Sequence, residues 1–339
     1  MKVKNMVTQR SKRNGNEVQT GTDGPRTSAI TLAALMLSAV ALWLMTGFTL
    51  ADAAPVRGAN ASTGPASVLR AQHLALKDQL ANNAFNRPLV LASDLTSKDV
   101  KGDIYTVIPH PFDKVSGALS GPQVWCDILI LHLNTKYCSV AREQQATTLL
   151  MNVGKKFDQP LDESYRLAFA WKLADRQADY LRVALTADTG PLSTHDYRIT
   201  LEAVPLENGT TFLHLSYAYG FGVTGKIAMS AYFSTVGRVK VGFTVTGKEE
   251  DGSPIYIGGM RGLVERNTMR YYLAIEAYLG ALTLAPRAQF EKRIGDWFAA
   301  VERYPRQLHE IEKTEYLDMK RKEQRRQMES EALAVPVKG

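Results

Sequence analysis

The chain has 339 residues, of which 45% are apolar and 22% are charged, and these proportions are typical of a soluble globular protein. They exclude a wholly disordered chain, a collagen and a polytopic membrane protein. Two cysteines are too few for a disulfide framework or a four-cysteine zinc site. Residues 1–53 hold six Lys/Arg and three Asp/Glu, so they supply +3 of the net charge of +7, and the rest of the chain gives little reason to expect nucleic acid as a partner.

The first 53 residues predict export. A segment with six basic residues, 1–28, precedes the uncharged apolar run 29–50, and Ala51-Asp52-Ala53 follows as a small-x-small site. This order is typical of a secretory signal peptide. The run is also long enough to span a bilayer, so an uncleaved membrane anchor is the alternative. Both interpretations place residues 54–339 outside the cytoplasm, which in a Gram-negative bacterium means the periplasm.

The next segments lead into a mixed α and β region. Residues 54–88 form a breaker-rich linker and then a helix over 66–84, whose leucines lie largely on one side. Strands are expected at 89–95 and 103–108, and two short helices at 111–119 and 122–131, where Pro122 suits a first helical turn. Six further strands follow, separated by turn residues that favour an antiparallel meander. They are expected at 133–140, 146–153, 164–173, 178–187, 196–205 and 210–219.

The two cysteines fall in this region, 12 residues apart. Cys126 lies in the second short helix and Cys138 in the strand that follows it. An oxidising compartment would allow a disulfide between them to persist. Two buried free thiols are the alternative, and a reactive thiol is a third one that needs a lowered pKa.

Alternation along the six strands predicts a sheet with one apolar face and one polar face. The apolar face needs a cover, and two helices are candidates for it. We expect the helix at 221–236 to be the one that the sheet grips, because it follows the sixth strand directly. The helix at 262–284 is apolar nearly all round and is expected to pack beside it. Helices at 288–303 and 307–329 complete the chain.

This order of elements resembles the START-like superfamily, also called SRPBCC, of lipid-transfer and polyketide-cyclase-type domains. The stretch from Gly102 to Val115 resembles the strand that enters a helix in such domains, and Trp125 has the expected place in the second helix. The resemblance implies an α+β helix-grip fold, in which a curved antiparallel sheet wraps a long helix. It places this domain at 89–284, with a helical C-terminal extension at 285–339, and implies a hydrophobic ligand in the cavity between sheet and helix.

Catalytic motifs are not apparent. The sequence has no phosphate-binding glycine loop, no G-x-S-x-G elbow and no Cys-x-x-Cys pair, and it indicates no cofactor and no metal. His195-Asp196 is expected in an exposed turn, with the two side chains pointing apart. His214 is expected at the surface or under a helix, and His110 at a strand-to-helix corner. Arg261 and Glu265 have the spacing of an i,i+4 pair, and the basic run 320–326 is interpreted as a solvated helix end or a contact for anionic lipid.

An aromatic set on the apolar face is the candidate site. Either these rings are core, or they line a cavity in which tyrosine hydroxyls provide the polar contacts. The residues are Phe169, Trp171, Tyr197, Tyr217 and Tyr219, with Tyr165 as a neighbour. The leading hypothesis is extracytoplasmic binding or carriage of a hydrophobic small molecule or lipid. The alternatives are a cyclase- or hydrolase-type enzyme that uses the same cavity, and a structural or interaction protein whose core is filled.

Overall fold

The computed structural model describes residues 64–144, 146–235 and 237–334. These residues belong to one compact unit. The predicted signal or anchor segment 1–53 and most of the linker lie outside the described residues. Among the helices that the structure describes, none is long and apolar enough to cross a membrane.

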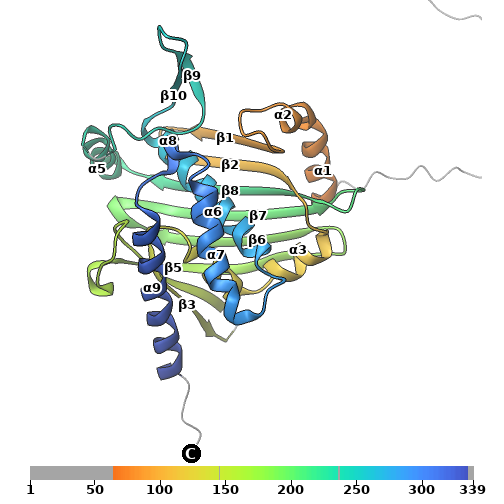
Figure 1. Ribbon diagram of the computed structural model, residues 1–339, viewed down its shortest axis with the longest axis vertical. Coiled ribbons are helices and arrows are strands. Elements are labelled where there is room, and N and C mark those ends of the chain that lie inside the picture. The colour runs from red at the N-terminus through yellow and green to blue at the C-terminus, as the bar shows by residue number, and fades with distance from the viewer. Residues whose placement is uncertain (1–63, 145, 236, 335–339) are drawn as a thin grey trace, which may run out of the picture. The chain divides into compact units, whose positions relative to one another are not determined.

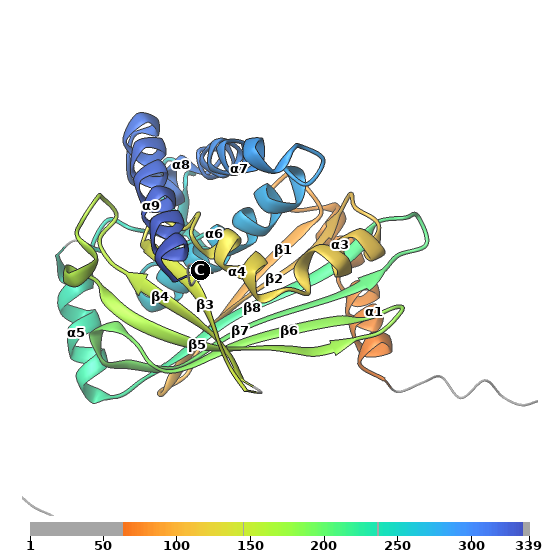
Figure 2. The ribbon, with the colours of Figure 1, turned by 90° about the horizontal axis from the view of Figure 1, so that it is seen from below.

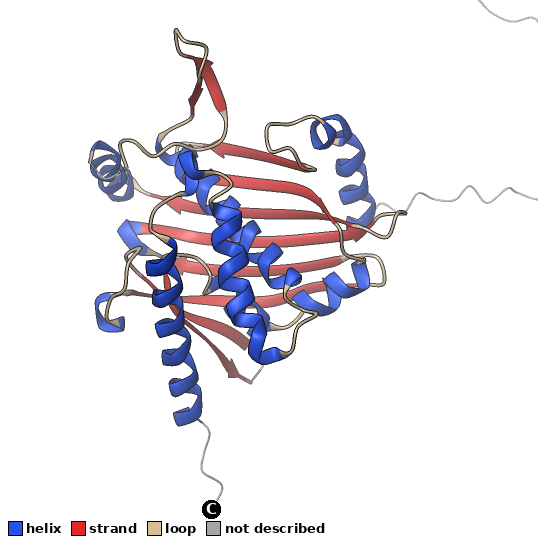
Figure 3. Cartoon of the chain, viewed as in Figure 1, coloured by secondary structure: helices blue, strands red, loops and turns tan. Residues whose placement is uncertain are grey.

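The core of the structure is an eight-stranded sheet in which every neighbouring pair is antiparallel. Its spatial order is β1-β2-β8-β7-β6-β5-β4-β3, so the last strand of the meander returns to pair with β2 (Figures 1 and 3). The strands are β1 (Leu89–Leu95), β2 (Asp99–Ile108), β3 (Thr135–Glu143), β4 (Ala146–Val153), β5 (Tyr165–Arg176), β6 (Leu181–Thr189), β7 (Thr194–Pro205) and β8 (Thr211–Phe221). The meander predicted from the turn residues is confirmed.

Helices cover the concave face of this sheet, as Figure 2 shows. They are α3 (Phe112–Leu119), α4 (Pro122–Leu129), α6 (Gly259–Gly280), α7 (Pro286–Val301), the short α8 (Pro305–Leu308) and α9 (Lys313–Ala334). Helix α5 (Val223–Ser234) lies at one end of the sheet, and a separate hairpin of β9 (Val245–Lys248) and β10 (Pro254–Tyr256) follows it (Figure 1). The predicted α+β helix-grip fold, with its C-terminal helices, is confirmed.

The helix that the sheet grips is α6, so the expectation that it would be 221–236 was wrong. Helix α6 crosses β1, β2 and β8 and buries most of its length. Helix α5 instead packs mainly against the end of β8 and the turn η2 (Pro191–Ser193), and its Val223 and Ile227 are exposed. Chain order misled the prediction, because the β9–β10 excursion separates the last strand from its covering helix.

Helix α6 approaches β2 very closely at one point. Gly102 of β2 lies directly under Thr268, and a Cβ atom at Gly102 would collide with the threonine hydroxyl. Thr268 turns that hydroxyl back to the carbonyl oxygen of Val264, at 2.7 Å, so it adds no unpaired polar group to the contact. The absence of a side chain at Gly102 therefore allows the helix to sit on this edge of the sheet.

The other sheet face is only partly polar, contrary to the prediction. Helices α1 (Pro65–Ala75) and α2 (Lys77–Ala81) cover one end of it, where Figure 2 shows α1, and their leucines form a second apolar cluster with Tyr180, Val204 and Phe212. Near this cluster His214 lies between two carboxylates, with Nε2 2.8 Å from Asp103 and Nδ1 3.1 Å from Glu202. Burial alone would lower the pKa of His214, but these two hydrogen bonds raise it.

The C-terminal extension packs on the main domain. Helix α7 lies against α6, and α9 lies against α7 and β3. The interpretation of 320–326 as a solvated or lipid-binding run was wrong for its first residue. Lys320 is fully buried, donates to the carbonyl oxygens of His132 and Thr135, and pairs with Glu323, which also pairs with Lys136. Helix α9 is thus held in place by buried ion pairs, together with the buried side chains of Tyr316 and Met319.

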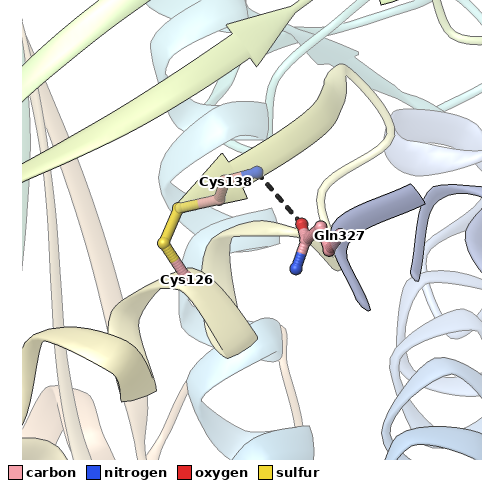
Figure 4. Close-up of a disulfide and its surroundings, with 3 residues drawn as sticks. All are labelled: Cys126, Cys138 and Gln327. Carbon is pink, nitrogen blue, oxygen red and sulfur yellow. Dashed lines mark hydrogen bonds between the residues drawn. A yellow bond between two sulfur atoms is a disulfide. The ribbon is translucent and has the colours of Figure 1, made fainter. Parts of the chain in front are cut away.

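The structure places the two cysteines in a disulfide between α4 and β3, with their Cα atoms 5.2 Å apart. Figure 4 shows this bond beside Gln327 of α9, whose Oε1 accepts a hydrogen bond of 3.0 Å from the backbone N–H of Cys138. Both cysteines are fully buried. The bridge therefore connects the helix before the meander to the sheet, at the place where the last helix docks.

Removal of this bridge should destabilise the domain. We expect the double variant Cys126→Ala/Cys138→Ala to lose roughly 2–3 kcal/mol of unfolding free energy, because a crosslink closing so short a loop restricts the unfolded chain. Urea denaturation of the variant and of the oxidised and reduced wild type measures the difference. Equal stability of oxidised and reduced wild type would contradict the expectation, and so would two alkylated thiols in denatured, unreduced protein.

Candidate functional site

A cavity of about 630 Å³ lies between the sheet and the N-terminal half of α6. Strands β4, β5, β7 and β8 form its floor, and α6 contributes Leu263, Asn267 and Tyr271 from above. Met229 of α5 and Leu192 of η2 close one end, while the loops around His132 and Gln159 close the other. Its size lies within the roughly 300–1,000 Å³ that is usual for small-molecule sites.

Four of the five aromatic residues predicted from the sequence line this cavity: Phe169, Tyr197, Tyr217 and Tyr219. Trp171 does not, and its assignment to the lining is corrected. It lies two residues beyond Phe169 on the same face of β5, where its partly buried side chain packs against the main core. The cavity is confined to the half of the sheet near Tyr165 and Leu167, so alternation alone could not show where along β5 it would end.

The tyrosines form a continuous aromatic wall. Tyr197 stacks on Tyr219 with ring centroids 5.3 Å apart, and Tyr217 meets Tyr219 at 5.7 Å and Tyr271 of α6 at 5.2 Å. Burial raises the pKa of Tyr197 to about 12, so its phenol is neutral at physiological pH. Its hydroxyl lies 2.7 Å from that of Thr194, whereas no described residue forms a hydrogen bond with the buried hydroxyl of Tyr219.

The opposite end of the cavity is polar and is built by two loops. Asn134 and Gly154 join these loops through two hydrogen bonds, from the Asn134 side chain to the Gly154 carbonyl (2.5 Å) and from the Gly154 N–H to the Asn134 carbonyl (2.7 Å). His132 and Gln159 lie on either side of this connection and are 4% and 5% exposed. Both residues belong to irregular segments that carry no periodic signal, so the sequence did not indicate them as cavity residues.

The cavity reaches the surface beside η2. Leu192 and Tyr165 belong to the lining and are also exposed, at 54% and 40%. Leu192 and Ser193 both have positive φ, near 57° and 58°, which is uncommon for residues with a side chain. The lining contains one carboxylate, that of Glu163, which belongs to the loop that carries Gln159 and lies 3.9 Å from the ammonium of Lys155. The interior wall is therefore apolar and aromatic.

Buried charges hold α6 above the cavity. Glu310, with its side chain 4% exposed, pairs with Arg270 of α6 (3.0 Å), Lys156 (2.6 Å) and Lys240 (2.7 Å). Glu265, expected to pair with Arg261, instead accepts hydrogen bonds from Ser93 and from the backbone N–H groups of Phe243 and Thr244, while Arg261 bonds Ser93. These contacts fix the helix to loops that come from distant parts of the chain.

The other histidines weighed in the sequence lie away from the cavity. Asp196 is exposed, as expected, and His195 is half-buried, but their side chains meet at 2.8 Å instead of pointing apart. Asp196 has φ near 50° at an irregularity of β7, and this bend turns its carboxylate toward the ring. His110 lies at the corner between β2 and α3, where its carbonyl oxygen accepts from the Thr211 hydroxyl. None of these residues adds chemistry to the cavity.

No family model matches the chain, and no curated protein matches it. Solved structures to which it is similar include truncated norcoclaurine synthase from Thalictrum flavum, with 16% identity over 42% of this chain and 96% of that one, at a TM-score of 0.28. Human StAR-related lipid transfer protein 5 has 9% identity over 50% of this chain and 90% of that one, at a TM-score of 0.27. The Zhui aromatase/cyclase from Streptomyces sp. R1128 has 12% identity over 63% of this chain and 96% of that one, at a TM-score of 0.25. The helix-grip fold of this chain is shown by its own strand order and by the position of α6, and nothing about its function is taken from these structures.

The Glu310 cluster makes a prediction about pH. Burial alone would raise the pKa of Glu310, but Arg270, Lys156 and Lys240 lower it to about 2. An unfolded glutamate has a pKa of about 4.3, so the stabilising contribution is complete above that value and is lost as the pH falls toward 2. We expect Glu310→Gln to cost roughly 3–5 kcal/mol at pH 7, because it leaves buried cations without their acid.

Urea denaturation between pH 7 and pH 2.5 measures this cost, which should shrink as the pH falls below 4.5. Glu312→Gln is the matched control, since the side chain of Glu312 is 78% exposed on the same segment and should leave stability unchanged at every pH. A cost for Glu310→Gln that stays constant with pH would contradict the expectation.

Proposed function

We propose that this protein binds, and carries, a hydrophobic small molecule or lipid in the cavity between the sheet and α6. The observation that carries the proposal is the cavity itself, about 630 Å³ of space behind an aromatic wall, with an opening beside Leu192. An interior packed at normal density leaves few voids larger than a water molecule. A cavity of this size is costly unless a ligand occupies it, because its lining loses contacts and apolar burial.

The alternative of a filled structural core is less consistent with this volume. The alternative of a cyclase- or hydrolase-type enzyme needs an acid or base aimed at a bound substrate. The lining has one carboxylate, Glu163, which is exposed and pairs with Lys155, and burial raises the pKa of Tyr197 to about 12. Ligand binding therefore requires the fewest further assumptions about these side chains.

Filling the cavity should abolish binding. In Leu167→Trp the indole would occupy ligand space, and we expect at least a tenfold loss of affinity for the fluorescent apolar probe 1-N-phenylnaphthylamine, together with loss of co-purifying lipid in native mass spectrometry. Leu173→Trp is the matched control on the same face of β5, since Leu173 lies outside the lining. The proposal fails if both variants bind the probe as the wild type does.

We also propose that the protein acts outside the cytoplasm. The support is the basic segment, apolar run and Ala51-Asp52-Ala53 site of the sequence, together with a disulfide in the described residues. A fusion of residues 1–60 to a reporter enzyme that is active only outside the cytoplasm should be active in a bacterial host. A stable but inactive fusion would contradict this proposal.

A further inference from the structure

The imidazole of His132 has a fixed tautomer. Its Nδ1 accepts a hydrogen bond of 3.2 Å from the backbone N–H of Asn134, so this nitrogen carries the lone pair. Burial lowers the pKa of His132 well below its usual range, and Arg270, Lys320 and Lys156 lower it further, so the ring is neutral. The single ring proton is then on Nε2. This donor is buried and makes no hydrogen bond within ordinary distance to a described residue; the side-chain amide of Asn267, which also lines the cavity, is the polar group beside it.

The side-chain amide of Gln159 is fixed in the same way. Its Oε1 accepts a hydrogen bond of 2.7 Å from the backbone N–H of Lys155, which places the NH₂ group on the other side of the amide. The side chain is packed directly on Gly154, where an added Cβ would lie 2.6 Å from Oε1. Nε2 is buried and is also without an acceptor in the described part of the chain. A buried donor without an acceptor destabilises the empty protein, so a ligand that supplies the acceptor is favoured.

The two donors belong to one place in the cavity. His132 bonds Asn134, Gln159 packs on Gly154, and Asn134 and Gly154 are joined by two hydrogen bonds. Both side chains line the cavity together with Asn267 of α6. Two loops thus present a pair of oriented N–H donors at the end opposite α5, while the aromatic wall of tyrosines forms the side of the same cavity.

The surroundings of this pair carry more positive than negative charge. Lys156, Lys240 and Arg270 share the single carboxylate of Glu310, and Lys136 and Lys320 share that of Glu323. These basic groups outnumber the two acids, and since burial lowers the pKa of Lys156 and of Lys320 to about 8, the positive potential beside His132 is greatest below that pH. Such a potential favours an anion over a neutral acceptor, and hydrogen bonds to an ionised acceptor are about twice as strong as neutral ones.

We propose that the ligand is a carboxylate, an apolar molecule with one ionised carboxyl group whose oxygens accept hydrogen bonds from His132 Nε2–H and Gln159 Nε2–H while its apolar body lies against the tyrosine wall. This inference rests on the proposed function, because it needs the cavity to hold a ligand at all. A carboxylate has two oxygens at a fixed spacing and can satisfy both donors at once. The apolar body of a fatty acid or of a fused-ring acid suits the wall equally.

The test uses three fluorescent probes with one apolar body: 1-pyrenebutanoic acid, its methyl ester and 1-pyrenebutanol. At pH 6.5 the acid is ionised and the buried lysines keep their charge, and we expect the acid to bind the wild-type protein about tenfold more tightly than the ester or the alcohol. Two variants remove one donor each and keep the local hydrogen bond. Gln159→Glu retains an oxygen for the Lys155 N–H, and His132→Asn retains an acceptor for the Asn134 N–H. Each should abolish the preference for the acid while the ester binds as before.

Lys155→Gln is the control for charge at the rim, because the side chain of Lys155 is 59% exposed and lies outside the donor pair. The Lys155→Gln variant should keep the preference for the acid. If Lys155→Gln loses this preference while Gln159→Glu and His132→Asn keep it, the inference is overturned. Equal binding of all three probes to the wild type would overturn it too, while leaving the proposed function intact. Binding of none of the probes would overturn both. If one donor variant does not fold, as judged by circular dichroism, the other decides.

Discussion

The contact between Gly102 and Thr268 is the constraint on which the rest of the structure depends. It seats α6 against β2, at the β1-β2-β8 edge of the sheet, because no side chain separates the strand from the helix there. The strands β4 and β5 lie farther along the curved sheet and cannot meet the same straight helix. The space between these strands and α6 is the cavity. The seating of α6 on β2 therefore explains both the tight packing at one edge of the sheet and the open volume farther along it.

Once α6 is seated, its own side chains determine which groups face the cavity. Leu263, Asn267 and Tyr271 recur every four residues and therefore lie on the side turned toward the cavity. Arg270 lies on another side and meets Glu310, which brings Lys156 and Lys240 to the same point. The charged cluster thus holds the loop that carries Gln159 close to the helix. A site for an apolar ligand is in this way bounded by a network of buried ions.

The polar end of the cavity follows from local backbone chemistry. Each of the two donors is oriented by a backbone N–H group of its own loop, through Asn134 for His132 and through Lys155 for Gln159. Each orienting N–H group lies only a few residues from the side chain that it orients. The donors therefore keep their direction without support from a ligand. The disulfide between α4 and β3 and the docking of α9 then fix these loops relative to the sheet. Stability of the C-terminal helices and geometry of the site are therefore linked.

The sequence by itself determined the sheet, its apolar face, and most of the aromatic wall. Alternation in β4 to β8 has a period of two, so Phe169, Tyr197, Tyr217 and Tyr219 had to lie on one covered face, and turn residues marked where each strand ends. The all-round apolar character of 262–284 likewise indicated burial. Only the tertiary structure decided that α6 is the gripped helix, that Trp171 lies beyond the cavity, and that His132 and Gln159 belong to it. The physical reason is that periodicity describes which face a side chain is on, whereas the depth of a cavity and the meeting of two loops depend on contacts between residues far apart in the chain.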